Sequence, residues 1–189
     1  MKLMKGIIIA LICMIITSVS AQQTIEGVTL PATVTVEGET LNLNGGGLRE
    51  KLWFNLYVGG LYLKTASSDA NAIIAKDESM SIHLEITSKM ISSKNLTEAI
   101  MEGFNKSTNG QTEIIKEEIK TFLAAFKEEI VVGNKFDISY KAKMGVLVKK
   151  NGKLLTTIAG FEFKKALFGI WLGEKPADKK LKEGMLVIR

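Results

Sequence analysis

The segment "NGGGLREKLWFNLYVGGLYLK", residues 44–64, carries the pattern from which the fold and the function are predicted. Three consecutive glycines stand close before Arg49, and an aromatic and aliphatic run with two tyrosines follows. The chain takes almost all of its positive charge from lysine, and its only other arginine is the last residue, Arg189. A guanidinium differs from an ammonium because its planar fork binds a carboxylate or phenolate through two parallel hydrogen bonds. Arg49 is therefore a candidate anion-binding residue.

Two tyrosines complete the candidate ligand-binding set of Arg49, Tyr57 and Tyr62. The glycines before Arg49 permit close approach of a ligand to the backbone. In an extended segment Arg49 and Tyr57 share one face, because eight residues separate them. Tyr62 is an odd number of residues from both, so it joins that face only if a bend at Gly59–Gly60 shifts the alternation.

A purely structural role for the same residues is the alternative. Arg49 would then be a charge at the start of a strand that faces water or pairs with an internal carboxylate such as Glu50 or Glu85. The two tyrosines would be core aromatics whose hydroxyl groups reach the rim.

The N-terminus predicts export. A basic start, MKLMK, precedes the apolar run GIIIALICMIIT and the small residues SVSA. This order is typical of a secretory signal peptide at residues 1–21, with cleavage after Ala21. The apolar run is short for a membrane span, although an uncleaved anchor helix is the alternative. The mature protein is expected in the periplasm or the surrounding medium.

The mature chain, residues 22–189, is predicted to form a single domain without disulfides, because the only cysteine, Cys13, lies in the signal peptide. Removal of Lys2 and Lys5 lowers the formal net charge from +5 to +3. This excess is small and its lysines are interleaved with glutamates, so no nucleic-acid partner is expected. No apolar run after the signal peptide is long enough to cross a bilayer.

The order of apolar patterns, with strands before helices and then strands and helices again, predicts an α+β fold. Strands are predicted at 33–43 (a hairpin), 48–64 (two strands, or one bent at the glycine pair), 80–86 and 135–160, with an Asn151-Gly152 hairpin turn in the last. The triple glycine is expected to break the strand before it. Helices are predicted at 95–104, capped by Asn95 and Glu98, and at 110–130, 161–173 and 177–186.

Several chemistries lack the residues that they need. His83 is the only histidine and the mature chain has no cysteine, so no metal site is expected. His83 lies in the middle of a predicted strand on its polar face, which favours a surface or cavity-lining role over that of a catalytic base. The glycines before Arg49 have neither phosphate-loop nor dinucleotide-binding spacing, and no cofactor is expected.

The segment GGGLREKLWFNLYVGGLYL and the downstream FKKALFGIWLGEKPADKKLKEGML together resemble the chalcone isomerase-like family. The resemblance covers about residues 24–188 and is closer to bacterial secreted members and the plant fatty-acid-binding branch than to the flavonoid enzymes. It implies an open-faced β-sandwich, in which a large antiparallel sheet is backed by a layer of helices with a ligand cleft between them.

The resemblance also implies roles for individual residues. The family's arginine after the glycine-rich turn contacts the ligand and matches Arg49. The hydroxyl-bearing residue on the next strand matches Tyr57, and Tyr62 is the tyrosine of GLYL. In the fatty-acid-binding branch this arginine grips the carboxylate, whereas in the enzymes it holds the phenolate of the chalcone.

The catalytic polar network of the isomerases has no counterpart here. They carry a tyrosine and, seven residues later, an asparagine on the helix after the middle strand, where this chain has Leu96 and Gly103. A shift of one residue would place Asn95 at the first position. We therefore expect a non-catalytic binder of a small amphipathic anion such as a fatty acid. One alternative is an isomerase or intramolecular lyase with an unidentified substrate. Another is a structural or partner-binding envelope protein with an empty or closed cleft.

Overall fold

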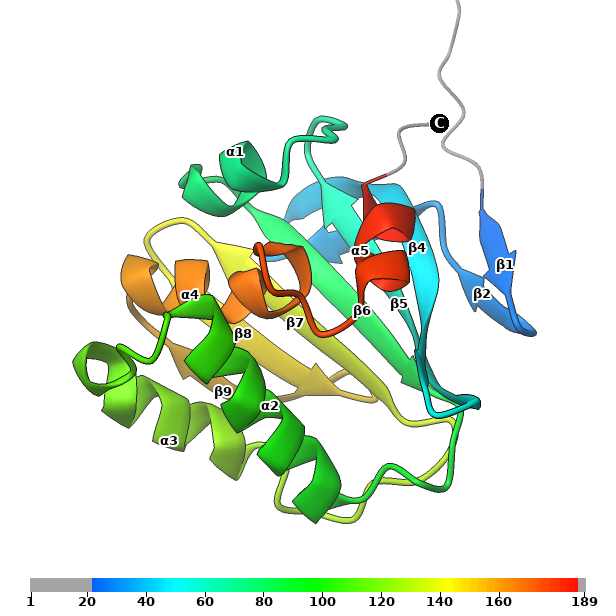
Figure 1. The fold of residues 1–189 in the computed structure, drawn as a ribbon. Coiled ribbons are helices and arrows are strands. Elements are labelled where there is room, and N and C mark those ends of the chain that lie inside the picture. Colours follow the sequence, from blue (N-terminus) through cyan, green and yellow to red (C-terminus); the bar gives the residue numbers. More distant parts are fainter. Residues whose placement is uncertain (1–21, 187–189) are drawn as a thin grey trace, which may run out of the picture.

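Seven antiparallel strands lie side by side in chain order and form one curved sheet (Figure 1). The structure is a computed structural model that describes residues 22–186, so the predicted signal peptide, residues 1–21, lies outside it. The strands of the sheet are β3 Thr33–Val36, β4 Glu39–Lys51, β5 Phe54–Leu63, β6 Met80–Ile86, β7 Lys135–Lys141, β8 Gly145–Lys150 and β9 Lys153–Ile158. A separate ribbon of two strands precedes them, β1 Gln23–Ile25 and β2 Val28–Leu30.

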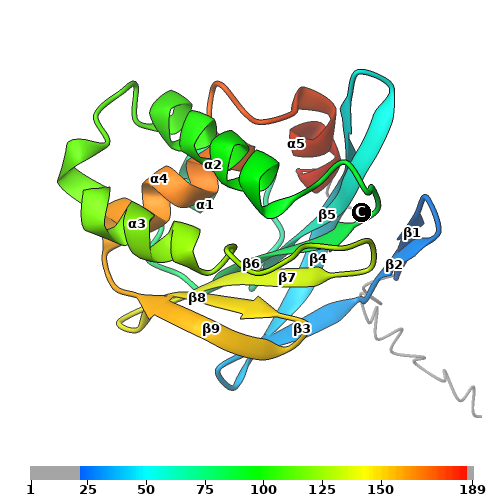
Figure 2. The same ribbon diagram turned by 90° about the horizontal axis from the view of Figure 1, so that it is seen from below.

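The helices cover one face of the sheet, as Figure 2 shows from a second direction. They are α1 Ala70–Ala75, α2 Ser93–Ser107, the short 3-10 helix η1 Glu113–Ile115, α3 Lys116–Ala124, α4 Phe161–Leu172 and α5 Lys179–Met185. Nine of the twelve residues of α4 are buried, and this helix contacts α1, α2 and α5. Within residues 22–186, no helix combines the length and the apolar character that crossing a bilayer requires. The predicted α+β class and the open-faced arrangement of sheet and helices are confirmed.

Both faces of the sheet bury apolar side chains. The main core lies between the sheet and the helices and contains aromatic pairs such as Phe104–Phe163 and Phe122–Phe126. On the other face the β1–β2 ribbon contributes Val28 and Leu30, which pack with Val58 of β5.

The triple glycine does not break its strand, and that prediction is wrong. β4 continues through Gly45–Gly47 with a bulge between Leu43 and Gly45. The reason for glycine is the approach of α5: a Cβ at Gly45 would lie 2.3 Å from the carbonyl oxygen of Gly184. These glycines therefore allow a helix to pack directly on the strand backbone.

The chain reverses instead at Leu52 and Trp53, between β4 and β5. Residues 48–64 thus form parts of two strands, which was one of the two predicted alternatives. The break lies at Leu52–Trp53 and not at Gly59–Gly60. Neither turn residue is a usual turn former, which is why the sequence pattern did not indicate the position.

The helix boundaries also differ from the predictions. α2 begins one turn earlier than Asn95 suggested, because Ser92 is the N-cap and its hydroxyl accepts a hydrogen bond from the Asn95 N–H. The predicted helix at 110–130 is reduced to η1 and α3, although Phe126 and Ile130 beyond its end are still buried. The hairpin turn at Asn151-Gly152 is confirmed between β8 and β9.

Candidate ligand-binding site

Arg49 and Tyr57 are direct neighbours across the β4–β5 pair. Directly paired residues of adjacent strands point to the same face, so the expected proximity arises across two strands and not along one. Arg49 Nη1 donates a hydrogen bond of 3.3 Å to the Tyr57 hydroxyl, and its Cζ lies 5.4 Å from the centre of the Tyr57 ring. The structure therefore brings these two predicted site residues together on the face of the sheet that the helices cover.

Tyr57 is buried and fixed from a second side by Trp171 of α4. The Trp171 Nε1–H donates a hydrogen bond of 2.9 Å to the Tyr57 hydroxyl. A phenol accepts two hydrogen bonds and donates one. Since Arg49 and Trp171 both donate to this oxygen, the Tyr57 proton has no acceptor among the described residues and is available to a ligand. Trp171 was not predicted as a site residue, although it lies within the second family motif.

The Arg49 guanidinium is half-buried and has no carboxylate within ion-pair distance in the part of the chain that the structure describes. The pairing alternatives named from the sequence are wrong, because Glu50 lies 3.4 Å from Lys180 and Glu85 lies 3.3 Å from Lys135. The neighbouring Tyr57 oxygen raises the pKa of Arg49 further above its usual value, against the opposing effect of burial. Asp178 and Glu102 lie near enough to raise the pKa of Arg49 as well, but neither forms an ion pair with it. Among residues 22–186 the site thus contains a permanent positive charge without a directly bound carboxylate.

A cavity of about 430 Å³ opens at this pair. Its walls come from the β4–β5 turn, the loop between β6 and α2, and the first turns of α2. The residues that line it are Arg49, Lys51, Leu52, Leu56, Tyr57, Met90, Ile91, Asn95, Leu96, Glu98, Ala99 and Glu102. Its volume falls in the range of small-molecule sites, about 300–1,000 Å³. The cavity combines apolar side chains with the half-buried cation of Arg49, whereas Lys51, Glu98 and Glu102 are exposed at its rim.

Behind Arg49 and Tyr57 the space between the sheet and the helices is almost filled. The inner cavity measures about 20 Å³ and is closed by apolar side chains that include Leu84, Phe126 and Ile170. In this conformation the space large enough for a small molecule is therefore in the outer cavity.

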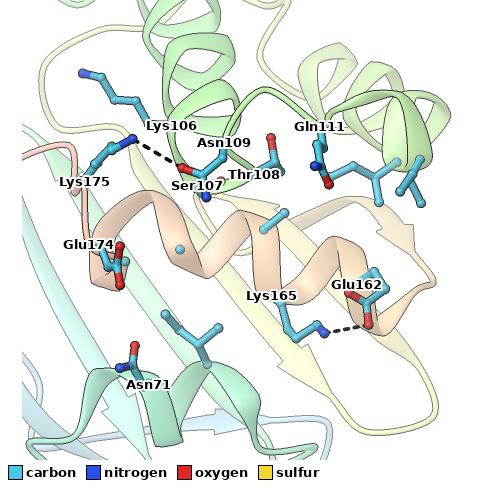
Figure 3. Close-up of a pocket in the computed structure, with 16 residues that line it drawn as sticks. Asn71, Lys106, Ser107, Thr108, Asn109, Gln111, Glu162, Lys165, Glu174 and Lys175 are labelled. Atoms are coloured by element: carbon cyan, nitrogen blue, oxygen red, sulfur yellow. Dashed lines mark hydrogen bonds and ion pairs between the residues drawn. The ribbon is translucent and has the colours of Figure 1, made fainter.

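A slightly larger hollow, about 460 Å³, lies elsewhere, between α1, α4 and the C-terminal end of α2 (Figure 3). Figure 3 shows that polar side chains dominate its rim. Its lysines have protein partners: Lys106 pairs with Glu102, Lys165 lies 2.7 Å from Glu162, and Lys175 donates a 3.3 Å hydrogen bond to Asn109. It contains none of the predicted site residues and offers no unpaired anchor comparable to Arg49.

Residues 22–187 match the family described as chalcone isomerase-like. The chain belongs to the chalcone isomerase-like family. Among solved structures, the Arabidopsis thaliana fatty-acid binding protein AtFAP1 is similar, with a TM-score of 0.69 and 17% sequence identity over 88% of this chain and 96% of that one. At this identity the likeness shows the shared fold. No curated protein matches the chain in sequence.

Leu96 and Gly103 are the positions that the resemblance assigns to the polar helix residues of the family's isomerases, and neither side chain carries a hydrogen-bond donor. Leu96 lines the cavity at Arg49 beside Tyr57, whereas Gly103 does not line it. Gly103 lies where α2 crosses α4, and a Cβ there would be 2.7 Å from Cγ2 of Ile170. An asparagine at this position would require the Ile170 side chain to move. Asn95, one residue from Leu96, uses its side-chain amide to donate to the Met90 carbonyl.

Tyr62, the third predicted site residue, lies on the opposite face of the sheet. The β5–β6 register runs without a shift through Gly59–Gly60, so the odd spacing from Tyr57 is preserved. The Tyr62 hydroxyl donates a 3.0 Å hydrogen bond to the Pro31 carbonyl, and the ring packs with Val36 and Leu41. Burial raises the pKa of Tyr62. Tyr62 therefore does not share a cavity with Arg49.

His83 also lies on this opposite face, where its Nδ1 is 2.7 Å from Oδ1 of Asp137 on the paired strand. It is mostly buried within a row of polar cross-strand pairs that includes Ser81–Ser139. This position is remote from the cavity at Arg49. Residues 22–186 contain no cluster of three or more potential metal ligands.

Proposed function

We propose that this protein binds a small amphipathic carboxylate, such as a fatty acid, with its head group at Arg49 and Tyr57. One observation carries the proposal: among residues 22–186, a half-buried guanidinium that forms no ion pair lies beside a tyrosine proton that has no acceptor. A carboxylate satisfies both groups at once. The similarity of fold to AtFAP1, a fatty-acid binding protein, supports this choice of ligand class.

The two parts of the cavity would contribute differently to affinity. A hydrogen bond to a charged group contributes about 1.5–3 kcal/mol, whereas each buried methylene contributes about 0.8 kcal/mol. A chain with several buried methylenes therefore supplies most of the free energy of binding. Arg49 supplies orientation and selects an anionic head group over a neutral one.

Binding is preferred over catalysis for a physical reason. An isomerase of this family needs donors aimed at charge that develops in the transition state. Leu96 and Gly103 provide none from their side chains, and Tyr57 with Arg49 is sufficient to hold an anion. We further propose that the protein acts after export, as the basic, apolar and small-residue order of positions 1–21 indicates.

The decisive experiment is lipid extraction from protein purified from its native host, followed by mass spectrometry. Wild-type protein should release free fatty acids in near-stoichiometric amounts, and the Arg49→Ala variant should release far less. Equal amounts of bound fatty acid in both proteins, or none in the wild type, would contradict the proposal.

A further inference from the structure

The turn between β4 and β5 has an unusual composition for its backbone. Leu52 and Trp53 have φ angles of 49° and 71°, in the left-handed region that side chains with a Cβ disfavour. Four other pairs of consecutive residues have this conformation among the described residues, and each has glutamate or asparagine first and glycine second. These pairs are Glu26-Gly27, Glu37-Gly38, Asn109-Gly110 and Asn151-Gly152. The β4–β5 turn alone places two large apolar residues where this chain otherwise places turn formers.

The same residues are the most exposed apolar side chains at this end of the sheet. Trp53 is 98% exposed and Leu52 is 76% exposed, and Phe54 beside them is half-exposed. An exposed aromatic and aliphatic tip is unfavourable in water and usually marks a contact surface. The turn projects from the body of the protein (Figure 2). Its shape therefore fits insertion into a lipid layer better than burial in a groove of a partner protein.

Two neighbouring loops present further apolar side chains at the same end. Met90, in the loop between β6 and α2, is half-exposed and lines the same cavity as Leu52. Val131 and Val132, in the loop before β7, are also half-exposed. The adjacent Gly133 is tied to the end of β6 by a 2.8 Å hydrogen bond from its N–H to the Ile86 carbonyl. All three segments therefore lie at one end of the sheet (Figure 1).

Positive charge surrounds this apolar tip. Lys51, Lys89, Lys94 and Lys127 are exposed and form no ion pair within residues 22–186. Lys51 precedes the turn, Lys89 precedes Met90, and Lys94 lies in the first turn of α2. Phe126, the neighbour of Lys127, accepts a hydrogen bond from Ser93, which places Lys127 beside that turn. The exposed Glu98 and Glu129, and Glu26, which accepts a 3.2 Å hydrogen bond from Asn55 beside the tip, offset part of this charge.

We propose that the β4–β5 turn is a membrane-docking tip, which inserts Leu52, Trp53 and Phe54 into the interface of an anionic phospholipid bilayer. Tryptophan and phenylalanine with flanking lysines are the composition that binds such an interface, through apolar burial and attraction to anionic head groups. The strained Leu52-Trp53 pair is explained because side chains that enter the bilayer must stand at the apex of the turn.

The tip also forms part of the entrance to the cavity at Arg49, since Leu52 of the tip and the preceding Lys51 line that cavity. If the protein binds an amphipathic carboxylate as proposed, docking would place the entrance of the cavity against the bilayer in which such acids dissolve. This last link rests on the proposed function, whereas docking itself rests only on the turn and the charges around it.

The test measures binding of the protein to vesicles of phosphatidylethanolamine and phosphatidylglycerol by co-sedimentation. All proteins start at Gln22, which retains every helix and strand described. The key variant combines Leu52→Asn with Trp53→Gly and so copies the turn at Asn151-Gly152, which should fold at least as well as the wild type. We expect this variant to bind vesicles more than about tenfold more weakly, because two large apolar side chains are lost.

A matched control is Ile114→Ser, which removes an apolar side chain that is 80% exposed but borders the hollow of Figure 3. It should bind vesicles like the wild type. Trp fluorescence gives a second readout: Trp171 is buried, so a blue shift on addition of vesicles reports Trp53. Phosphatidylcholine vesicles should bind more weakly, because they lack the anionic head groups.

Wild-type protein that does not bind anionic vesicles would overturn the proposal, and so would a Leu52→Asn, Trp53→Gly variant that binds them equally well. Self-association through the tip, detected as a dimer that the same variant abolishes, together with absent vesicle binding, would assign the tip to a protein contact instead. Arg49→Lys should bind vesicles normally. Loss of vesicle binding with fatty-acid binding retained would therefore count against docking alone. Loss of fatty-acid binding with vesicle binding retained would count against the proposed function alone.

Discussion

The indole of Trp171 holds the phenol of Tyr57 by a 2.9 Å hydrogen bond, although 114 residues separate the two along the chain. The bond links the most buried helix, α4, to β5, the strand that bears Tyr57 of the cavity lining. It fixes the Tyr57 oxygen in place, while the Tyr57 proton has no acceptor among residues 22–186. The two family motifs therefore meet in one site, because Tyr57 belongs to the first and Trp171 to the second.

This link predicts that Tyr57→Phe affects stability as well as binding. The variant leaves the buried Trp171 N–H without an acceptor, which costs about 1–3 kcal/mol. Trp171→Phe should be destabilising in its own right, but the double variant should lose less than the sum of the two. Urea unfolding of all four proteins gives the coupling energy, expected at about 1 kcal/mol. Strict additivity would show that the hydrogen bond contributes nothing.

Arg49→Lys should weaken fatty-acid binding while folding stability stays nearly unchanged. The variant keeps the charge but loses the planar fork, and loss of a hydrogen bond to a charged group costs about 1.5–3 kcal/mol, hence roughly tenfold or more in affinity. Stability is spared because Arg49 has no carboxylate partner within residues 22–186. Titration with a fluorescent fatty acid and thermal melts measure the two quantities.

Lys51→Gln is the matched control for this experiment, since Lys51 lines the same cavity but is exposed at its rim. It should reduce affinity less than Arg49→Lys does. If neither Arg49→Lys nor Arg49→Ala changes the affinity, Arg49 does not anchor the ligand and its role is structural.

The fold class could be predicted from the sequence, because the local periodicity of apolar residues shows which segments are strands and which are helices. Alternation along β6 and the Asn151-Gly152 signal both describe neighbours in the chain. The role of Gly45–Gly47 could not be found in this way. These glycines accommodate α5, about 140 residues further on, and a local reading takes three glycines for a break.

The site was predictable to a similar extent. Arg49 was identified by its chemistry, as the one guanidinium in the body of a lysine-rich chain. Its pairing with Tyr57 required the position of the turn, and Leu52-Trp53 carries no turn signal. Tyr62 was wrongly included among the site residues. Its place in the motif does not show which face of the sheet its side chain occupies, and only the strand register decides that.

The binder interpretation predicts no acceleration of chalcone cyclisation. Purified protein should convert a hydroxychalcone no faster than a lysine-rich protein of similar size and charge, since Leu96 and Gly103 supply no polarising donor. The measurement is absorbance of the substrate with time. Turnover that disappears in Arg49→Ala would contradict the binder interpretation and support the intramolecular lyase.

Export predicts a defined N-terminus. Cleavage after Ala21 should yield a protein that begins at Gln22, in part cyclised to pyroglutamate. N-terminal sequencing or intact-mass measurement of protein from the periplasm or medium tests this. A full-length chain that begins at Met1 and sediments with membranes would show that residues 1–21 are retained as an anchor.

Lys164 predicts an unusual dependence of stability on pH. This lysine of α4 is completely buried, and its Nζ donates to the carbonyls of Ile73, Ile74 and Lys76 at the end of α1. Burial lowers the pKa of Lys164 from 10.5 to about 8, although the nearby carboxylate of Asp77 opposes the shift. Between these two pH values the unfolded chain binds the proton and the folded chain has lost it, so a rise in pH stabilises the folded state.

The free energy of unfolding should therefore increase by about 2 kcal/mol from pH ~7.5 to pH ~9.5, as measured by urea titration. Above pH ~10 the trend should reverse. Burial raises the pKa of Tyr140 to about 12, so in this range the unfolded chain loses its tyrosine proton first. Lys164→Met should remove the increase whatever its effect on absolute stability, whereas Lys165→Met, on the same helix with an exposed ion pair to Glu162, should keep most of it. An identical pH profile in wild type and Lys164→Met would mean that Lys164 keeps its proton throughout this range, stabilised by the three carbonyls that end α1.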